Sequence, residues 1–115
     1  MTDPSPTDAE VVAVVDIRVA EGRSDATVAA LEACVVKTHE EPGCLVYAVH
    51  RDEADPLHLV VVERWRSQED LDAHLATPHV ADLFAFAGEP GNLAAPPQLT
   101  FARPLGLGQP GKSSL

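Results

Sequence analysis

VVVERWRSQEDLDAHLATPHVADLFAF, residues 60–86, decides how this chain folds and holds most of the side chains that could do chemistry. Its apolar start predicts a strand that ends at Trp65, the only tryptophan. Ser67 is followed by acidic residues in the pattern of a capping box, which predicts a helix start. Thr77 and Pro78 then restart the helix, because threonine can cap and proline lacks only an N–H that is unpaired at the first helical position.

The rest of the chain extends this stretch to a βαββαβ order. Runs of β-branched residues between turn residues predict strands at Glu10–Ala20, Cys44–Arg51, Leu57–Trp65 and Gln98–Arg103. Capping residues and apolar periodicity predict helices at Asp25–His39 with Ser24 as N-cap, from Ser67 onward, and at His79–Ala87. This order belongs to the α+β class and predicts a ferredoxin-like fold with an antiparallel sheet and both helices on one face.

The length of 115 residues suits a single domain with one core. We assign this ferredoxin-like domain to residues 10–103. Residues 1–9, rich in proline and aspartate, are expected to form a disordered N-terminal tail, and residues 104–115, rich in glycine and proline, a flexible C-terminal tail. Cys34 and Cys44 lack CxxC spacing and are expected to be reduced.

Helical spacing predicts which side chains face the core. The first helix is expected to bury Val28, Leu31, Val35 and Thr38. The later helical segments are expected to bury Leu71, His74, Leu75, Val80, Leu83 and Phe84.

Charge and hydropathy exclude several classes of partner. The net charge of −10 repels phosphate and no cluster of Lys or Arg offsets it, so we expect neither nucleic acid nor membrane as a partner. No apolar run approaches the roughly 18 residues of a membrane span, and the acidic N-terminus does not resemble a signal peptide. A cytoplasmic location is therefore expected.

The first three strands are apolar on both faces, whereas two helices can cover only one of them. On the third strand, for example, Leu59 and Val61 alternate with Val60 and Val62. A bare valine-rich sheet face is an aggregation hazard. We therefore expect a homodimer in which a second copy covers this face, under the two-fold symmetry that most oligomers use.

Four residues are candidates for chemistry: Trp65, Glu63, His74 and Tyr47. Strand alternation puts Trp65 in phase with Val61 and Glu63, and helical spacing puts His74 on the buried side. A buried, neutral histidine can accept a proton. The alternatives are structural: a tryptophan that closes the core, a carboxylate that is solvated or paired with Arg51 or Arg66, and a core histidine satisfied by a neighbour.

Other chemistries lack a motif. The sequence has no HExxH, CxxC, GxGxxG, GxxxxGK[ST] or GxSxG. His74 and His79 are five residues apart, a spacing that would splay their rings on one helix, so no metal site is expected. His50 and His58 flank the predicted hairpin turn and are expected at the surface. The sequence therefore predicts a small, aromatic-lined pocket suited to an aromatic organic ligand.

The segments EPGCLVYAVHRD (residues 41–52) and VVERWRSQEDLDAHLATPHV (residues 61–80), with the βαββαβ order, resemble the antibiotic biosynthesis monooxygenase-like family. The resemblance covers roughly residues 10–103 and is strongest to the quinol monooxygenases within that family. It implies a dimeric α/β barrel.

The resemblance also implies cofactor-independent oxidation of a phenolic or hydroquinone-type aromatic substrate by O₂. A base deprotonates the phenol, the anion passes an electron to O₂, and the radical pair recombines on carbon. On the matching positions, His74 accepts the proton, Trp65 holds the ring, and Tyr47 and Glu63 orient the substrate. The remaining substrate-binding positions are His79, Leu71, Leu83, Phe84 and Val61.

Related branches of the family suggest alternatives. Haem-degrading relatives use an asparagine on the first strand, which residues 10–20 lack, so haem breakdown is not expected. Another branch isomerises or degrades a small phosphorylated signalling molecule, and the scarcity of basic residues around the pocket disfavours this activity. A non-catalytic, small-molecule-binding dimer is the alternative from a different class.

Overall fold

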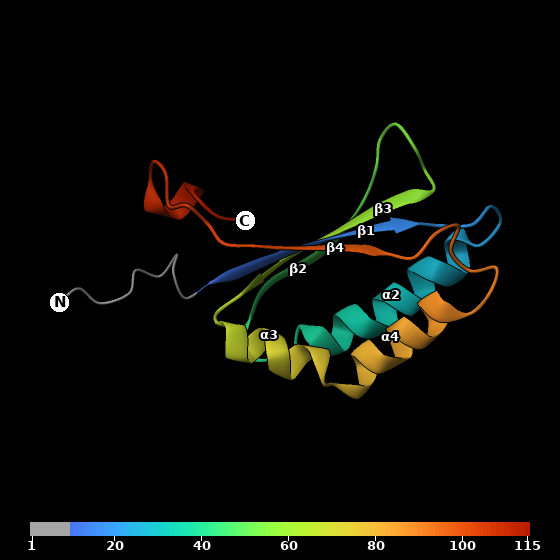
Figure 1. Ribbon diagram of the computed structural model, residues 1–115, viewed down its shortest axis with the longest axis horizontal. Coiled ribbons are helices and arrows are strands. Elements are labelled where there is room, and N and C mark those ends of the chain that lie inside the picture. Colours follow the sequence, from blue (N-terminus) through green and yellow to red (C-terminus); the bar gives the residue numbers. More distant parts are fainter. Residues whose placement is uncertain (1–9) are drawn as a thin grey trace.

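The computed structural model describes residues 10–115, which form a four-stranded antiparallel sheet and the helices that pack on it (Figure 1). The strands are β1 (Val11–Arg18), β2 (Cys44–Arg51), β3 (His58–Trp65) and β4 (Gln98–Ala102). The helices are α2 (Ser24–Thr38), α3 (Gln68–Leu75), α4 (Pro78–Gly88) and the short 3₁₀ helix η1 (Pro110–Lys112). The predicted α+β, ferredoxin-like architecture is confirmed, and the strand ends lie within two residues of their predicted positions.

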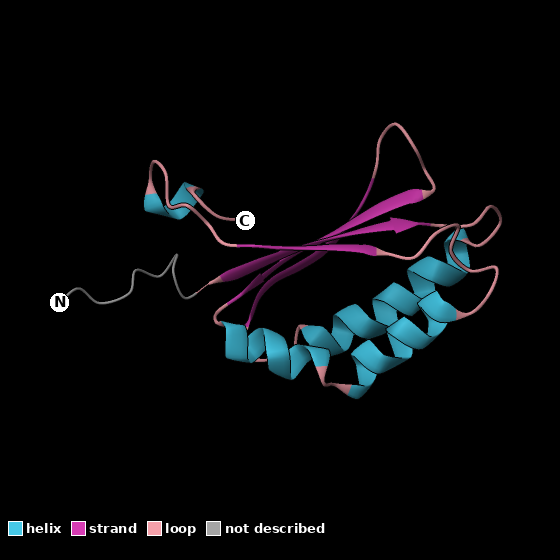
Figure 2. Ribbon diagram, in the orientation of Figure 1, coloured by secondary structure: helices cyan, strands magenta, loops and turns pink. Residues whose placement is uncertain are grey.

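The sheet has the strand order β2-β3-β1-β4, with every neighbouring pair antiparallel. β2 and β3 form the predicted hairpin, in which Tyr47 lies opposite Glu63. β1 is central, and its Val14 lies opposite Val62 of β3 and Thr100 of β4. The helices α2, α3 and α4 all lie on one side of this sheet, and no helix among residues 10–115 covers the opposite side (Figure 2).

The two later helices begin where their capping residues predict. Ser67 accepts a hydrogen bond from the backbone N–H of Asp70, and Thr77 accepts one from that of Val80. The prediction that Ser24 caps the first helix is wrong, because Ser24 is already the first helical residue and Arg23 precedes it without a side-chain cap. The hydroxyl of Thr27 instead donates to the Arg23 carbonyl at 2.8 Å.

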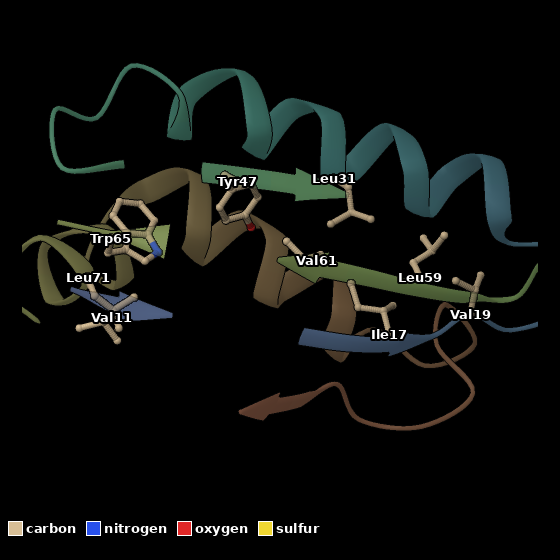
Figure 3. Close-up of a cluster of buried hydrophobic side chains, with 9 residues drawn as sticks. All are labelled: Val11, Ile17, Val19, Leu31, Tyr47, Leu59, Val61, Trp65 and Leu71. Carbon is tan, nitrogen blue, oxygen red and sulfur yellow. The ribbon is translucent and has the colours of Figure 1, made fainter. Parts of the chain in front are cut away.

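The core lies between the helices and the covered face of the sheet. Its largest fully buried side chain is Trp65, which lies beside Tyr47 from the neighbouring strand (Figure 3). The cluster comprises Val11, Ile17, Val19, Leu31, Tyr47, Leu59, Val61, Trp65 and Leu71. Cys34 and Cys44 are free thiols, as predicted.

The helices cover the sheet only in part, which corrects several predicted core positions. Val28, Leu75 and Phe84 are 38%, 41% and 46% exposed, so the prediction that they are buried is wrong. On α2 the buried residues are Thr27, Leu31, Cys34 and Thr38. The β4 edge receives little cover, since Leu99 and Phe101 share the helix side with Val15 and Ala13 yet remain 39% and 52% exposed. These side chains leave an apolar rim along one side of the core.

The bare face of the sheet is apolar at its centre and polar toward one end. Val62 lies opposite Val14 on β1 and Ala48 on β2, which makes an apolar row across three strands. All three are half-buried by their neighbours. The sheet is therefore apolar on both faces, as predicted. The face opposite the helices is exposed in a single chain, which favours its burial against a partner.

Beyond β4, the chain leads away from the sheet and passes through η1 shortly before the last residue (Figure 1). Ser113 there donates to the carbonyl of Leu107 at 2.7 Å. The flexibility proposed for residues 104–115 and the boundary at residue 103 stay predictions, and the N-terminal tail at residues 1–9 lies outside the described residues. Within residues 10–115, no helix combines the length and the apolar character needed to cross a bilayer.

We predict that Gly43→Ala destabilises the fold. A Cβ at position 43 would overlap the Cβ and Cγ atoms of Asp70, which is held in place by two hydrogen bonds with the N-cap residue Ser67. Overpacking of this kind costs about 1–3 kcal/mol in unfolding free energy, which urea denaturation would measure. Gly88→Ala is the matched control, because a Cβ there meets nothing within 4 Å. Equal stability of Gly43→Ala and wild type would contradict the prediction.

Candidate functional site

Strand β3 carries the residues that define the candidate site. Val61, Glu63 and Trp65 alternate toward the helices and are 1%, 5% and 0% exposed. The predicted phase of the tryptophan is thus confirmed by its burial. The same alternation brings a carboxyl group into the core.

The buried carboxyl of Glu63 accepts a hydrogen bond from the indole N–H of Trp65 at 2.9 Å. Neither arginine considered as a partner reaches it, since Arg66 pairs with Asp70 and Arg51 donates to Ser24. Burial raises the pKa of Glu63 to about 7, although the Trp65 hydrogen bond favours the charged form. This carboxyl can therefore exchange a proton near neutral pH.

His74, on α3, packs against both aromatic residues of the site. Its ring centre lies 4.4 Å from that of Trp65 and 5.6 Å from that of Tyr47. The residue is 3% exposed, so its predicted orientation toward the core is confirmed. Burial lowers the pKa of the His74 imidazole, and a hydrogen bond to Glu41 acts in the opposite direction. The ring is thereby kept neutral at physiological pH.

Glu41 is the site residue that the sequence did not reveal. It lies in the loop between α2 and β2, and its Oε2 atom is 2.8 Å from Nδ1 of His74 and 2.8 Å from Nε2 of His79. The side chain is only 16% exposed. Because 33 and 38 residues separate Glu41 from these histidines, no local spacing signals the contact.

The prediction that the two histidine rings diverge is wrong. It assumed one continuous helix, but His74 belongs to α3 and His79 to α4, with the break at Thr77 and Pro78 between them. The chain turns at this break, and the ring centres lie 6.0 Å apart. Both imidazoles therefore reach one carboxylate.

The contact with Glu41 determines the tautomer of His74. A carboxylate oxygen only accepts, so the hydrogen of the neutral ring resides on Nδ1, where it is donated to Glu41. Nε2 then carries the lone pair. Within residues 10–115, Nε2 has no hydrogen-bond partner. The arrangement provides a proton acceptor with an oriented ring.

A cavity of about 50 Å³ lies between the sheet and the helices, beside these residues. Glu63, His74 and Tyr47 are the polar side chains among its lining, and the apolar lining includes Val61, Leu71, Leu83, Phe84, Leu99 and Phe101. The structure thus brings together nearly all the predicted site residues. Two predicted residues do not line the cavity. Trp65 packs against the His74 ring instead, and His79 lies beside an open hollow between α2 and α4.

Tyr47 is 7% exposed and faces the helix side, as its candidate role requires. Burial raises the pKa of its phenol, and the negative charge of Glu63 raises it further. Tyr47 therefore stays protonated, so its hydroxyl can donate a hydrogen bond.

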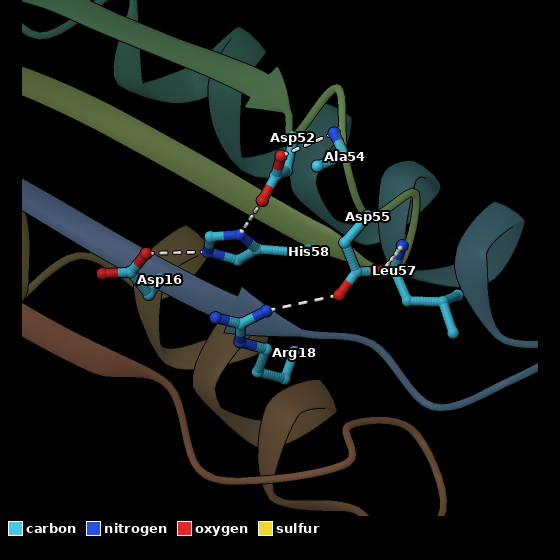
Figure 4. A network of polar contacts seen from close by, with 7 residues as sticks. All are labelled: Asp16, Arg18, Asp52, Ala54, Asp55, Leu57 and His58. Atoms are coloured by element: carbon cyan, nitrogen blue, oxygen red, sulfur yellow. Dashed lines mark hydrogen bonds and ion pairs between the residues drawn. The ribbon is translucent and has the colours of Figure 1, made fainter.

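His58 belongs to a separate polar network on the bare face. Its Nδ1 and Nε2 atoms lie 2.8 Å from carboxylates of Asp52 and Asp16 (Figure 4). His58 lies on the uncovered face, as its predicted surface position requires, but its side chain is only 12% exposed because the two carboxylates flank it. The two carboxylates raise the pKa of this imidazole, which is thereby stabilised as a cation between them.

Comparison with known proteins places this geometry in a family. Residues 10–85 match the sequence profile of the antibiotic biosynthesis monooxygenases. Rv0793 of Mycobacterium tuberculosis, a proposed monooxygenase, is 38% identical over 77 residues, which cover 67% of this chain and 73% of that protein. The uncharacterised protein sll1783 of Synechocystis is 29% identical over 84 residues, and the match spans 66% of this chain but only 57% of that relative.

Solved structures share the fold. The structure of Rv0793 aligns with a TM-score of 0.79 at 30% identity, covering 84% of this chain and 96% of that one. A proposed antibiotic biosynthesis monooxygenase of Nitrosomonas europaea gives 0.79 at 19% identity, covering 91% and 96%. A conserved protein of Methanosarcina mazei gives 0.79 at 20% identity, covering 85% and 95%.

The raised pKa of Glu63 predicts how stability changes with pH. Its carboxyl has a pKa of about 7 in the folded chain against an ordinary value of 4.5, so the folded state binds more protons between these values. Stability therefore falls as pH rises from about 4.5 to 7, by up to about 3 kcal/mol from this group.

Glu63→Gln removes this ionisation, and the variant should be more stable than wild type at pH 8 by about 1–3 kcal/mol, with the difference vanishing near pH 4.5. Urea denaturation across pH 4.5–8 would measure both curves. Glu53→Gln, at an exposed turn position, is the control and should parallel wild type. A constant offset between Glu63→Gln and wild type would refute the assignment.

Proposed function

Since this chain belongs to the antibiotic biosynthesis monooxygenase family, we propose that it is a cofactor-independent monooxygenase that oxidises a phenolic or hydroquinone-type aromatic substrate with O₂. The observation that carries this proposal is the oriented imidazole of His74. Glu41 holds its Nδ1–H, which leaves Nε2 as a proton acceptor among aromatic side chains beside a cavity.

The proposed reaction starts with removal of the phenolic proton by His74. The resulting anion passes one electron to O₂, and the two radicals combine at a ring carbon that bears hydrogen. Loss of water from this hydroperoxide leaves a second carbonyl group, so a phenol and O₂ give a quinone and one water. The protein deprotonates, orients and excludes water, and the substrate supplies all the electrons.

Other residues of the site hold the substrate in this scheme. Trp65 supports the imidazole of His74, with the ring centres 4.4 Å apart, and would meet the substrate ring only when the site opens. Tyr47 donates a hydrogen bond to the developing oxyanion. Glu63 orients the substrate and, with its pKa of about 7, can also return a proton during loss of water. The apolar contacts are supplied by Val61, Leu71, Leu83 and Phe84, and His79 supports Glu41 from the α4 side.

The substrate must open the site in order to enter. The cavity of about 50 Å³ accommodates one or two molecules the size of water or O₂, not an aromatic ring. Phe84, Leu99 and Phe101 line it and are also 39–52% exposed, so they form the boundary between cavity and solvent. Movement of these side chains admits a flat apolar substrate. No arginine or lysine lines the cavity, which disfavours a phosphorylated substrate.

We also propose that the protein acts as a homodimer whose sheets pack against each other. The bare face presents the row Val14, Val62 and Ala48, and no element of residues 10–115 covers it (Figure 2). A second copy offers the same apolar row under two-fold symmetry, whereas the charged network of Asp16, His58 and Asp52 stays toward the end of the face.

The activity is tested by oxygen uptake with reduced naphthoquinols and anthrones. Wild type should consume O₂ above background, and His74→Ala should lose about 100-fold or more in rate, as expected for a general base. His50→Ala is the control, because His50 is an exposed histidine on β2. His74→Gln, checked by circular dichroism and melting, separates loss of the base from loss of the fold.

Two results would contradict the proposed enzymatic activity. One is the absence of oxidation for every candidate, combined with saturable binding of the same molecules, which indicates a non-catalytic binding protein. The other is an unchanged rate in a folded His74 variant.

The dimer is tested by sedimentation. Val62→Lys places a charge at the centre of the apolar row and should convert the dimer to a monomer at micromolar concentration. Val36→Lys is the control, because Val36 is 53% exposed on α2, on the opposite side of the molecule. A monomeric wild type would refute the proposal.

A further inference from the structure

We propose that Glu41, His74 and His79 form a binding site for a divalent first-row transition metal such as Zn²⁺. Their three donor atoms, a carboxylate oxygen and two imidazole nitrogens, all lie within 4.8 Å of one another. Two histidines and one glutamate are a ligand set that proteins use for zinc, with a fourth position left open.

The three donor atoms are close to the spacing that an ion requires. In a tetrahedral zinc site, ligand bonds of about 2.0–2.1 Å place neighbouring donors about 3.3 Å apart. Oε2 of Glu41 now lies 2.8 Å from Nδ1 of His74 and 2.8 Å from Nε2 of His79, so each of these distances must grow by about half an ångström. The two imidazole nitrogens, which lie within 4.8 Å of each other, must come to the same spacing. The hydrogens now donated to Glu41 then move to the other nitrogen of each ring.

The surrounding structure holds the ligands in place. His74 is packed against Trp65, with ring centres 4.4 Å apart. His79 is the second residue of α4, just after the Thr77 cap and Pro78. The Glu41 loop is tied on by a hydrogen bond from the Cys44 N–H to the Glu41 carbonyl at 3.1 Å. Ligands whose backbones are fixed lose little entropy when an ion binds.

The site has an entry path and a favourable charge. His79 borders an open hollow of about 500 Å³ between α2 and α4, whose charged lining residues are Asp82 and Lys37. An ion can therefore reach the cluster without crossing the apolar core. The net charge of −10 raises the local concentration of cations around the protein. The nitrogen-rich donor set favours Zn²⁺ or Co²⁺ over Mg²⁺ and Ca²⁺, which prefer oxygen ligands.

The other carboxylate–histidine cluster does not meet these conditions. In the network of Asp16, His58 and Asp52, the two carboxylates contact opposite nitrogens of one ring, Nδ1 and Nε2. A single ion cannot coordinate both sides of an imidazole. This network serves as an internal comparison for the metal site.

Metal binding affects the activity proposed above, so this part of the inference rests on the proposed function. An ion bound at Nδ1 of His74 takes the lone pair there, so the ring hydrogen moves to Nε2. The nitrogen assigned as proton acceptor then becomes a donor. Occupation of the site by Zn²⁺ therefore switches off deprotonation of the substrate without blocking the cavity.

Binding is tested by titrating untagged, chelator-treated protein with Zn²⁺ in a calorimeter and with Co²⁺ by visible absorption. One ion per chain should bind with a micromolar or tighter dissociation constant, and Co²⁺ should show the intense absorption of four-coordinate geometry. Loss of a ligand in His79→Ala or Glu41→Gln should weaken binding by at least about 100-fold, since even outer-shell partners are worth 10–100-fold. Both variants must retain the wild-type circular dichroism spectrum.

His50→Ala and His58→Ala are the controls, and both should bind Zn²⁺ like wild type. The proposal is overturned if wild type binds no ion below about 1 mM, or if folded His79→Ala and Glu41→Gln bind as tightly as wild type. Equal loss of binding in the control variants would show adventitious surface binding only, which also overturns it.

The switch is tested separately in the wild-type protein. One equivalent of Zn²⁺ should lower the rate of oxygen uptake at least tenfold, and chelation should restore it. Binding without inhibition overturns the switch and leaves the metal site standing. If no substrate is oxidised under any condition, the proposed function fails, while the binding isotherms still decide whether the metal site exists.

Discussion

The period of two along β3 is the constraint on which the site depends. Because Val61 and Trp65 must face the core, Glu63 between them must face it too. The buried indole N–H needs an acceptor, and an unpaired donor of this kind would cost about 1–3 kcal/mol. Glu63 meets that need at 2.9 Å, but its own charge is then poorly solvated, which raises its pKa to about 7. One structural requirement thus creates a group that exchanges protons at neutral pH.

The strand order and the orientations of Trp65 and His74 could be predicted from the sequence, because they follow from local periodicity and capping. The depth of Glu63 could not, since a carboxyl at a strand end is usually solvated or paired with arginine. Helix faces were predicted less well: Val28 and Phe84 lie on apolar stripes, yet they are exposed because α2 and α4 leave the sheet edges uncovered. Burial on a helix depends on what the helix packs against, and periodicity does not contain that information.

The role of Glu41 was beyond sequence reasoning for a different reason. Its contacts to His74 and His79 bridge 33 and 38 residues, and they exist only because the helix breaks between the two histidines. The break itself was visible at Thr77 and Pro78. The sequence does not indicate the direction in which α4 leaves this break. That direction places the two ring centres 6.0 Å apart instead of turning the rings away from each other. Long-range contacts of this kind decide whether neighbouring histidines act together.

The tautomer of His74 therefore depends on a loop outside the cavity. A neutral imidazole has one lone pair, and the position of that lone pair is set by the partner of the other nitrogen. Here the partner is Glu41, whose loop approaches α3 closely because Gly43 has no side chain to meet Asp70. The Gly43 carbonyl also accepts a hydrogen bond from the Arg66 N–H at 2.9 Å, which ties the loop to the end of β3. The close approach of a glycine thus fixes a carboxylate, the carboxylate fixes a tautomer, and the tautomer determines whether Nε2 can take a proton.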